Sequence, residues 1–82
     1  MLNVQVAGPG CSNCAKLEAK VKEALLRLGI EATLTKITDF KAIAASGVLM
    51  TPGLLINGKV VSQGKIPDDA TLEKILKEAS GS

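Results

Sequence analysis

The sequence predicts an α/β domain with the element order β-α-β-α-β-β-α, in which a four-stranded mixed sheet is flanked by three helices. Three observations lead to this fold class. Apolar and polar residues alternate over residues 2–7 and 31–37, apolar residues recur at helical spacing in two long segments, and an Asn-Gly pair separates two apolar runs. The chain has 82 residues, 46% of them hydrophobic, so we expect one core and a single domain over residues 1–82.

The N-terminal half predicts a strand, a helix and a second strand. Residues 2–7 form the first strand, and the Gly-Pro-Gly turn at residues 8–10 ends it. The helix carries one apolar stripe and two oppositely charged pairs at i,i+4 spacing. The stripe consists of Leu17, Val21, Ala24, Leu25 and Leu28, and the pairs are Glu18 with Lys22 and Glu23 with Arg27. Gly29 is placed to end this helix, and residues 31–37 form the next strand.

The C-terminal half predicts a short helix, a hairpin and a final helix. The short helix begins near Asp39 and ends at Gly47. The apolar runs 53–56 and 59–63 flank Asn-Gly, which favours a type I′ turn because both central residues of that turn need a positive φ. The final helix opens at Pro67, Asp68 and Asp69 and has an apolar stripe made by Leu72, Ile75, Leu76 and Ala79.

Composition and charge exclude several classes of partner. The net charge of +2 comes from lysines interleaved with acids, without the clustered basic face or stacking aromatics of nucleic-acid-binding grooves. No apolar run is long enough to span a bilayer, so we expect no membrane insertion. The first residues lack the basic start and continuous apolar stretch of a secretion signal, and we therefore expect a cytoplasmic protein.

The two cysteines carry the chemistry that the sequence predicts. With no histidine in the chain, Cys–His and Ser–His nucleophiles and mixed Cys/His zinc sites are excluded. Cys11 precedes a predicted helix, where unpaired backbone N–H groups favour the thiolate, so we expect it to be the catalytic nucleophile. Cys14, in the first turn, is expected to be the second catalytic thiol, which resolves a mixed disulfide by attacking it.

Three segments together resemble the thioredoxin superfamily, and most closely its small prokaryotic redox-active disulfide members, over nearly the whole chain. They are the turn of Gly10, Cys11, Ser12, Asn13 and Cys14 after a strand, Thr51 and Pro52 before a strand, and the hairpin over residues 55–60. The resemblance implies a thioredoxin-like fold with Gly10, Ser12 and Asn13 in the active-site loop. It also implies that Pro52 is cis and packs against the disulfide, and that the backbone of Thr51 pairs with an extended substrate.

The resemblance further implies how such a protein acts. It would be a thiol–disulfide oxidoreductase that exchanges the Cys11–Cys14 disulfide or dithiol with a protein disulfide substrate, with a disulfide reductase as second partner. The redox-active disulfide would be its only redox group, with no separate cofactor and no metal, and we expect a monomer. The chain lacks a Trp before Cys11 and a Pro between the cysteines, unlike thioredoxin itself. Thioredoxin also keeps a buried acid in the strand that leads to its active site, whereas residues 2–7 here contain none, so the proton of Cys14 must pass to water or to another group.

Two alternatives stay open at this point. A glutaredoxin-like protein would bind glutathione beside Pro52 and the last helix, where Asp68 and Asp69 could contact it, although helix capping also explains these acids. A copper(I) carrier would use the two cysteines as thiolate ligands, but such domains end β-α-β, whereas this chain ends in a hairpin and a helix. We expect Lys16 to be a solvated side chain and Phe40, the only aromatic residue, to pack into the core.

Overall fold

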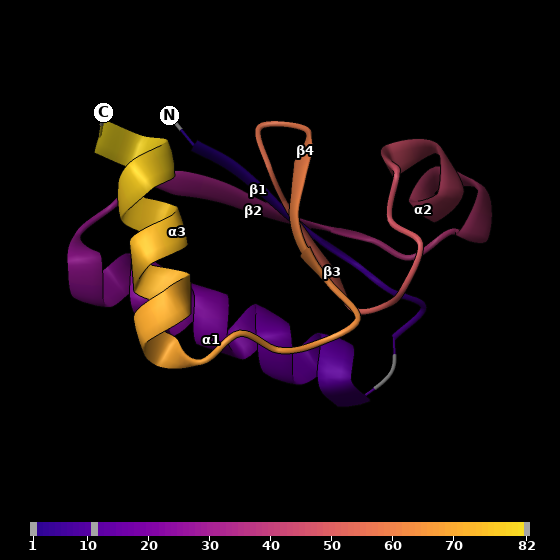
Figure 1. The fold of residues 1–82 in the computed structure, drawn as a ribbon, viewed down its shortest axis with the longest axis horizontal. Helices are drawn as coiled ribbons and strands as arrows, with labels where there is room; N and C mark the ends of the chain where they lie inside the picture. Colours follow the sequence, from indigo (N-terminus) through magenta and orange to yellow (C-terminus); the bar gives the residue numbers. More distant parts are fainter. Residues whose placement is uncertain (1, 11, 82) are drawn as a thin grey trace.

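The computed structural model describes residues 2–10 and 12–81 and confirms the predicted element order (Figure 1). Each predicted strand and helix is present, with ends within a few residues of those expected from the sequence. The elements are β1 (Leu2–Ala7), α1 (Ser12–Leu28), β2 (Ala32–Ile37), α2 (Phe40–Ser46), β3 (Gly53–Ile56), β4 (Lys59–Gln63) and α3 (Asp69–Gly81).

The four strands form one mixed sheet in the order β2-β1-β3-β4. β1 pairs in parallel with β2, to which α1 connects it, and antiparallel with β3, which continues through the hairpin into β4. The register places Val4 opposite Leu34 on one side and Ile56 on the other, so one face of the sheet presents a row of apolar side chains. β1 is therefore a central strand, and its C-terminal end leads directly into the loop that carries the cysteines.

Helices cover the two faces of the sheet unequally (Figure 1). α1 and α3 pack on one face and close the larger cluster of buried side chains, which includes Val4, Leu17, Leu54, Leu72 and Leu76. α2 packs on the other face with a smaller cluster that consists of Ala7, Ile43, Val48 and Leu55. Because the smaller cluster includes Ala7 at the end of β1, α2 lies at the same end of the sheet as the turn into α1.

The local signals for the hairpin turn and for the ends of the short helix are confirmed. Asn57 and Gly58 both have positive φ, 54° and 83°, as the predicted two-residue hairpin turn requires. The carboxylate of Asp39 accepts a hydrogen bond from the Ala42 N–H at 3.1 Å and so caps α2. Gly47 ends α2 in the left-handed conformation, with φ 93°. No helix within the described ranges is long and apolar enough to cross a membrane.

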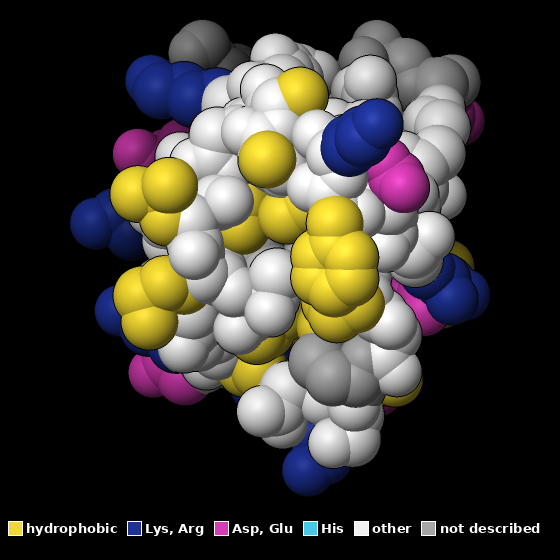
Figure 2. Space-filling view, turned by 90° about the vertical axis from the view of Figure 1, so that its right-hand side faces the viewer, with side chains coloured by type: hydrophobic (Ala, Val, Ile, Leu, Met, Phe, Trp, Pro, Cys, Tyr) yellow, Lys and Arg dark blue, Asp and Glu magenta, His cyan; other side chains and the backbone are white. Residues whose placement is uncertain are grey.

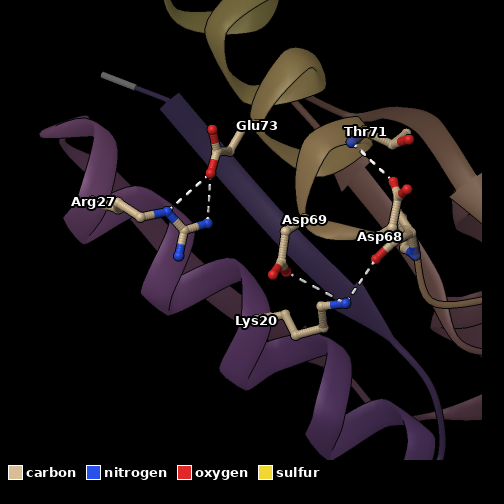
Figure 3. A network of polar contacts seen from close by, with 7 residues as sticks. Lys20, Arg27, Asp68, Asp69, Thr71 and Glu73 are labelled. Atoms are coloured by element: carbon tan, nitrogen blue, oxygen red, sulfur yellow. Dashed lines mark hydrogen bonds and ion pairs between the residues drawn. The ribbon is translucent and has the colours of Figure 1, made fainter.

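Two expectations about single side chains were wrong. Arg27 does not pair with Glu23 on its own helix but with Glu73 of α3, whose Oε2 lies 2.9 Å from Nε and 2.8 Å from Nη2 (Figure 3). A guanidinium can reach a facing helix as easily as its own next turn, and sequence spacing cannot choose between the two. Phe40 is 75% exposed rather than in the core, because Ile43 is the α2 side chain that enters the smaller cluster.

Candidate active site

The join between β1 and α1 brings Cys14 into the protein interior. β1 ends at Ala7 and α1 begins at Ser12, so Cys14 lies in the first helical turn, and only 6% of it is exposed. Ser12 and Asn13, beside it in the same turn, are exposed. Cys11, the expected nucleophile, lies outside the described residues and directly precedes the first residue of α1 in the sequence.

The backbone of Gly8 touches the sulfur of Cys14. A Cβ atom added at Gly8 would overlap Cys14 Sγ, would lie 3.3 Å from Cys14 Cβ, and would lie 3.8 Å from Thr51 Cβ. The N–H of Gly8 donates to the Ile37 carbonyl at 2.8 Å, which extends the pairing of β1 with β2 to this point. Gly8 is therefore a part of the site that sequence reasoning took only for a strand end.

The contact with Gly8 also places Thr51 beside Cys14. Thr51 is exposed, Pro52 is buried, and the peptide bond between them is cis, as expected from the resemblance. Thr51, one of the two candidate residues for substrate binding, is thus brought near the second cysteine, although 37 positions separate residues 14 and 51 in the chain.

The end of β4 holds the loop that carries Thr51 and Pro52. The side-chain carbonyl oxygen of Gln63 accepts hydrogen bonds from the N–H groups of Leu49, at 2.7 Å, and Met50, at 3.4 Å. The N–H of Gly64 donates to the carbonyls of Met50, at 3.1 Å, and Pro52, at 3.0 Å. Sequence reasoning missed both residues, since they follow Thr51 by more than ten positions and only the hairpin returns them to this loop.

A cleft of 130 Å³ opens beside Cys14, between the start of α1 and the ends of β1 and β2. Glu18 and Lys36 line it together with Cys14 and Gly8, and Glu18 Oε1 lies 3.4 Å from the Lys36 Nζ. The second oxygen, Oε2, lies 4.0 Å from Nζ of Lys22, the pair expected from helical spacing. Sequence spacing indicates that Cys14 and Glu18 share a helix face, but the pairing across to β2 depends on the fold.

The surface around this end of the molecule is rich in exposed apolar side chains. Leu49 is 87% exposed and Met50 62% exposed, both in the loop before Thr51, and Phe40 lies on α2 at the same end. Figure 2 shows that hydrophobic side chains spread over the middle of this face, whereas most Lys, Arg, Asp and Glu side chains lie toward its edges. Such a surface is suited to contact with another polypeptide.

Comparison with known proteins now decides the family. The profile of the thioredoxin domain matches residues 2–77. The chain belongs to the thioredoxin domain family. It is 36% identical over 76 residues to a thioredoxin of Methanothermobacter thermautotrophicus, covering 93% of this chain and 99% of the relative. It is also 36% identical over 77 residues to a thioredoxin of Methanocaldococcus jannaschii, covering 94% of this chain and 88% of that one.

The fold agrees with that membership. The structure is similar to that of thioredoxin-2, described as a component of malaria parasite protein secretion machinery, with a TM-score of 0.67 over 95% of this chain and 82% of the other. At 15% identity, this likeness shows a shared thioredoxin fold and nothing finer. As a member of the thioredoxin family, the chain is a thiol–disulfide oxidoreductase.

Asp68 and Asp69, the acids that could have contacted glutathione, have other partners: Asp68 caps the start of α3, and Asp69 pairs with Lys20 of α1 (Figure 3). Asp68 Oδ1 accepts the N–H of Thr71 at 3.0 Å, and hydrogen bonds from Thr71 lower the pKa of the Asp68 carboxyl below its usual value. Asp69 Oδ1 lies 3.5 Å from Lys20 Nζ, which also donates to the carbonyl of Pro67 at 3.1 Å. Capping and ion pairing account for both acids. Lys16 is exposed, as expected.

Proposed function

We propose that Cys11 and Cys14 are the reactive pair of this thioredoxin family member, which reduces or forms disulfides in protein substrates. The place of Cys14 carries the proposal: it is buried in the first turn of α1, against Gly8 and beside Thr51. Burial disfavours the Cys14 thiolate, whereas the helix N-terminus next to Cys11 in the sequence favours the Cys11 thiolate. Cys11 is therefore assigned the attack on substrate, and Cys14 the second step.

The exchange proceeds in two displacements. The Cys11 thiolate attacks one sulfur of the substrate disulfide, that S–S bond breaks, and one substrate sulfur leaves as a thiolate. Cys14, as a thiolate, then attacks the Cys11 sulfur of the mixed disulfide, and the second substrate sulfur leaves. Two electrons have passed to the substrate, the Cys11–Cys14 disulfide has formed, and a disulfide reductase restores the dithiol. No other redox group takes part.

The substrate in this proposal is a protein segment held over Thr51 and Pro52. The cis Thr51–Pro52 loop is fixed by Gln63 and Gly64 and lies next to Cys14, which supports a role in presenting the substrate backbone to the sulfurs. The exposed side chains of Leu49 and Met50 add an apolar surface that suits a polypeptide better than a small polar thiol. Gly10, Ser12 and Asn13 form the rest of the loop around the reactive pair, and we place the protein in the cytoplasm as a monomer.

Trapping of the mixed disulfide tests the proposal. Cys14→Ser, reduced and then mixed with a disulfide-bonded protein, is expected to accumulate a covalent adduct through Cys11, which intact-mass spectrometry detects and dithiothreitol releases. Cys11→Ser is expected to form no such adduct near neutral pH, because its remaining thiol is buried. The double variant Cys11→Ser/Cys14→Ser controls for non-covalent association.

Three other results would overturn parts of this assignment. An adduct with Cys11→Ser but none with Cys14→Ser would reverse the two roles. Turnover with glutathione as sole reductant, and none with a disulfide reductase, would favour a glutaredoxin-like activity. Tight copper(I) binding by the reduced native protein, with no adduct from either single variant, would replace the redox assignment with metal carriage.

A further inference from the structure

The cleft beside Cys14 contains an ion pair that disulfide exchange, as described so far, does not use. Its lining includes the buried Cys14, Glu18 on the same helix and Lys36 of β2. The side chain of Glu18 is only 19% exposed, against 60% for Lys36. Glu18 is thus a largely buried carboxylate that lines the same cleft as Cys14. From this position it can take part in proton transfer from the Cys14 thiol.

We propose that Glu18, positioned by Lys36, accepts the proton of Cys14 when Cys14 attacks the mixed disulfide. The inference rests on the roles proposed above for Cys11 and Cys14. It answers a question that the sequence raises, because β1 contains no acid that could take this proton.

The need for an acceptor follows from the burial of Cys14. A thiol must lose its proton before it attacks, and a site that is 6% exposed disfavours the resulting charge. Among the described residues, two elements contribute charged side chains near the cleft: α1 contributes Glu18 and Lys22, and β2 contributes Lys36. β1 and the loop over residues 47–52 contribute no ionisable side chain. Glu18 is the carboxylate among these groups, and a carboxylate oxygen can accept a proton.

The geometry supports a route from sulfur to carboxylate. Cys14 and Glu18 are four residues apart, which places them on one face of α1. The cleft volume of 130 Å³ compares with about 30 Å³ occupied by one molecule of liquid water, so water can relay the proton between the two side chains. Lys36, 3.4 Å from Oε1, holds the carboxylate toward β2 and the cleft.

The proton balance of the second step is then complete. The Cys14 S–H bond breaks, and its proton passes through water to a Glu18 oxygen. The Cys14 thiolate attacks Cys11, the bond between Cys11 and the substrate sulfur breaks, and the leaving thiolate takes up a proton from Glu18 or from solvent. Glu18 passes the proton that it accepted to the leaving thiolate or releases it to solvent, and no oxidant or reductant beyond the substrate disulfide and the cysteine pair is involved.

Glu18→Gln tests the proposal with 5,5′-dithiobis(2-nitrobenzoate), an aryl disulfide that releases one coloured thiolate in each step. The first release, by Cys11, is expected to keep its wild-type rate. The second release is expected to slow on the order of 10²-fold near neutral pH, the typical contribution of a positioned acid or base. Its rate should then rise with pH more steeply than in the wild type, because hydroxide replaces the lost acceptor.

Matched variants separate proton transfer from a general effect of charge or stability. Glu23→Gln makes the same charge change at an exposed position of the same helix and is expected to leave both releases unchanged. Glu18→Asp retains a carboxylate on a side chain that is shorter by one methylene. It is expected to keep much of the rate of the second release and the wild-type pH profile. Circular dichroism and urea titration of each variant establish that it is folded.

The outcomes distinguish this inference from the function on which it rests. If Glu18→Gln shows the second rate and pH profile of the wild type, the proton-acceptor role is overturned, while adduct trapping by Cys14→Ser still stands. If Cys14→Ser traps no adduct, the assignment of the cysteines fails instead. Should Glu18→Gln not fold, Lys36→Gln gives the second measurement: a selectively slowed second release supports the inference, and an unchanged one overturns it.

Discussion

At the scale of single residues, the contact between Gly8 and Cys14 is the feature that shapes the site. Gly8 is buried at the end of β1, and its lack of a side chain lets the backbone approach the Cys14 sulfur and Thr51. A glycine here is required for space rather than for an unusual φ. The same close approach contributes to the burial of Cys14, on which its role as the second thiol depends.

Gly8→Ala is expected to lower the free energy of unfolding of the reduced protein by about 1–3 kcal/mol, the usual cost of forcing extra volume into a packed interior. Urea titration measures this change. The same substitution in a Cys14→Ala background should cost less, because the sulfur that the new methyl group overlaps is gone and the nearest remaining atom named at this position is the Cβ of residue 14, 3.3 Å away. Equal costs in the two backgrounds would show that the sulfur does not determine the choice of glycine.

At the scale of elements, α3 is tied to α1 by polar contacts at both ends of their junction (Figure 3). Lys20 meets Asp69 near the start of α3, and Arg27 meets Glu73 one turn later. Exposed ion pairs of this kind contribute little to stability but favour one relative placement of two helices over others. Asp68 adds a cap to the first turn of α3, through its hydrogen bond from Thr71.

The cap predicts a pH dependence of stability with a definite sign. Hydrogen bonds from Thr71 hold the pKa of Asp68 below its ordinary value of 3.8, so the folded state binds the proton less readily than the unfolded state. The contribution of the ionised cap is therefore complete above that value and is lost as the pH falls through the lower folded pKa. Asn can also cap a helix but does not titrate in this range.

Comparison of Asp68→Asn with the wild type measures this effect. The stability difference between the two proteins in urea is expected to shift in favour of the variant as the pH falls from about 6 to about 2. Glu31→Gln, which removes an exposed carboxyl outside α3, provides the control for the general loss of negative charge. A difference between wild type and Asp68→Asn that stays constant over this range would contradict the assigned cap.

At the scale of the whole molecule, the larger of the two buried clusters supports the fold and the smaller one supports the site. The larger cluster, under α1 and α3, contains most of the fully buried large side chains, including Leu72 and Leu76. The smaller cluster lies under α2, where Val48 begins the loop that leads to Thr51. A protein of 82 residues is expected to have a free energy of unfolding of only about 4–12 kcal/mol, so a single large cavity in the larger cluster removes a substantial share of it.

Leu76→Ala is expected to lower the free energy of unfolding by about 2–5 kcal/mol, because it deletes a fully buried side chain from the larger cluster. Leu26→Ala makes the same chemical change at a position that is 83% exposed and is expected to stay within about 0.5 kcal/mol of the wild type. Guanidinium titration of both variants measures the difference. Similar losses from the two substitutions would contradict the division between core and surface described for these helices.

The sequence by itself determined the features that depend on near neighbours along the chain. Alternation predicted β1 and β2, helical spacing predicted α1 and α3, and the Asn-Gly pair between two apolar runs predicted β3 and β4, because each of these signals reflects the geometry of the element that it forms. The Asn57-Gly58 turn and the ends of the short helix, near Asp39 and at Gly47, were also predicted, since each involves residues a few positions apart. The sequence likewise placed Cys14 in the first turn of α1, where the structure has it.

Only the tertiary structure decided which distant residues meet. Gly8 and Thr51 both lie next to Cys14, and Gln63 binds the loop that leads to Pro52. Lys36 of β2 forms an ion pair with Glu18 of α1. No local sequence pattern distinguishes these residues from ordinary turn and surface positions. Arg27 pairs with Glu73 of another helix. Phe40 is exposed, whereas Ile43 packs into the cluster beneath α2. The physical reason is common to these cases: spacing sets which side of an element a side chain occupies, whereas the packing of elements sets which of several equally available partners lies opposite it.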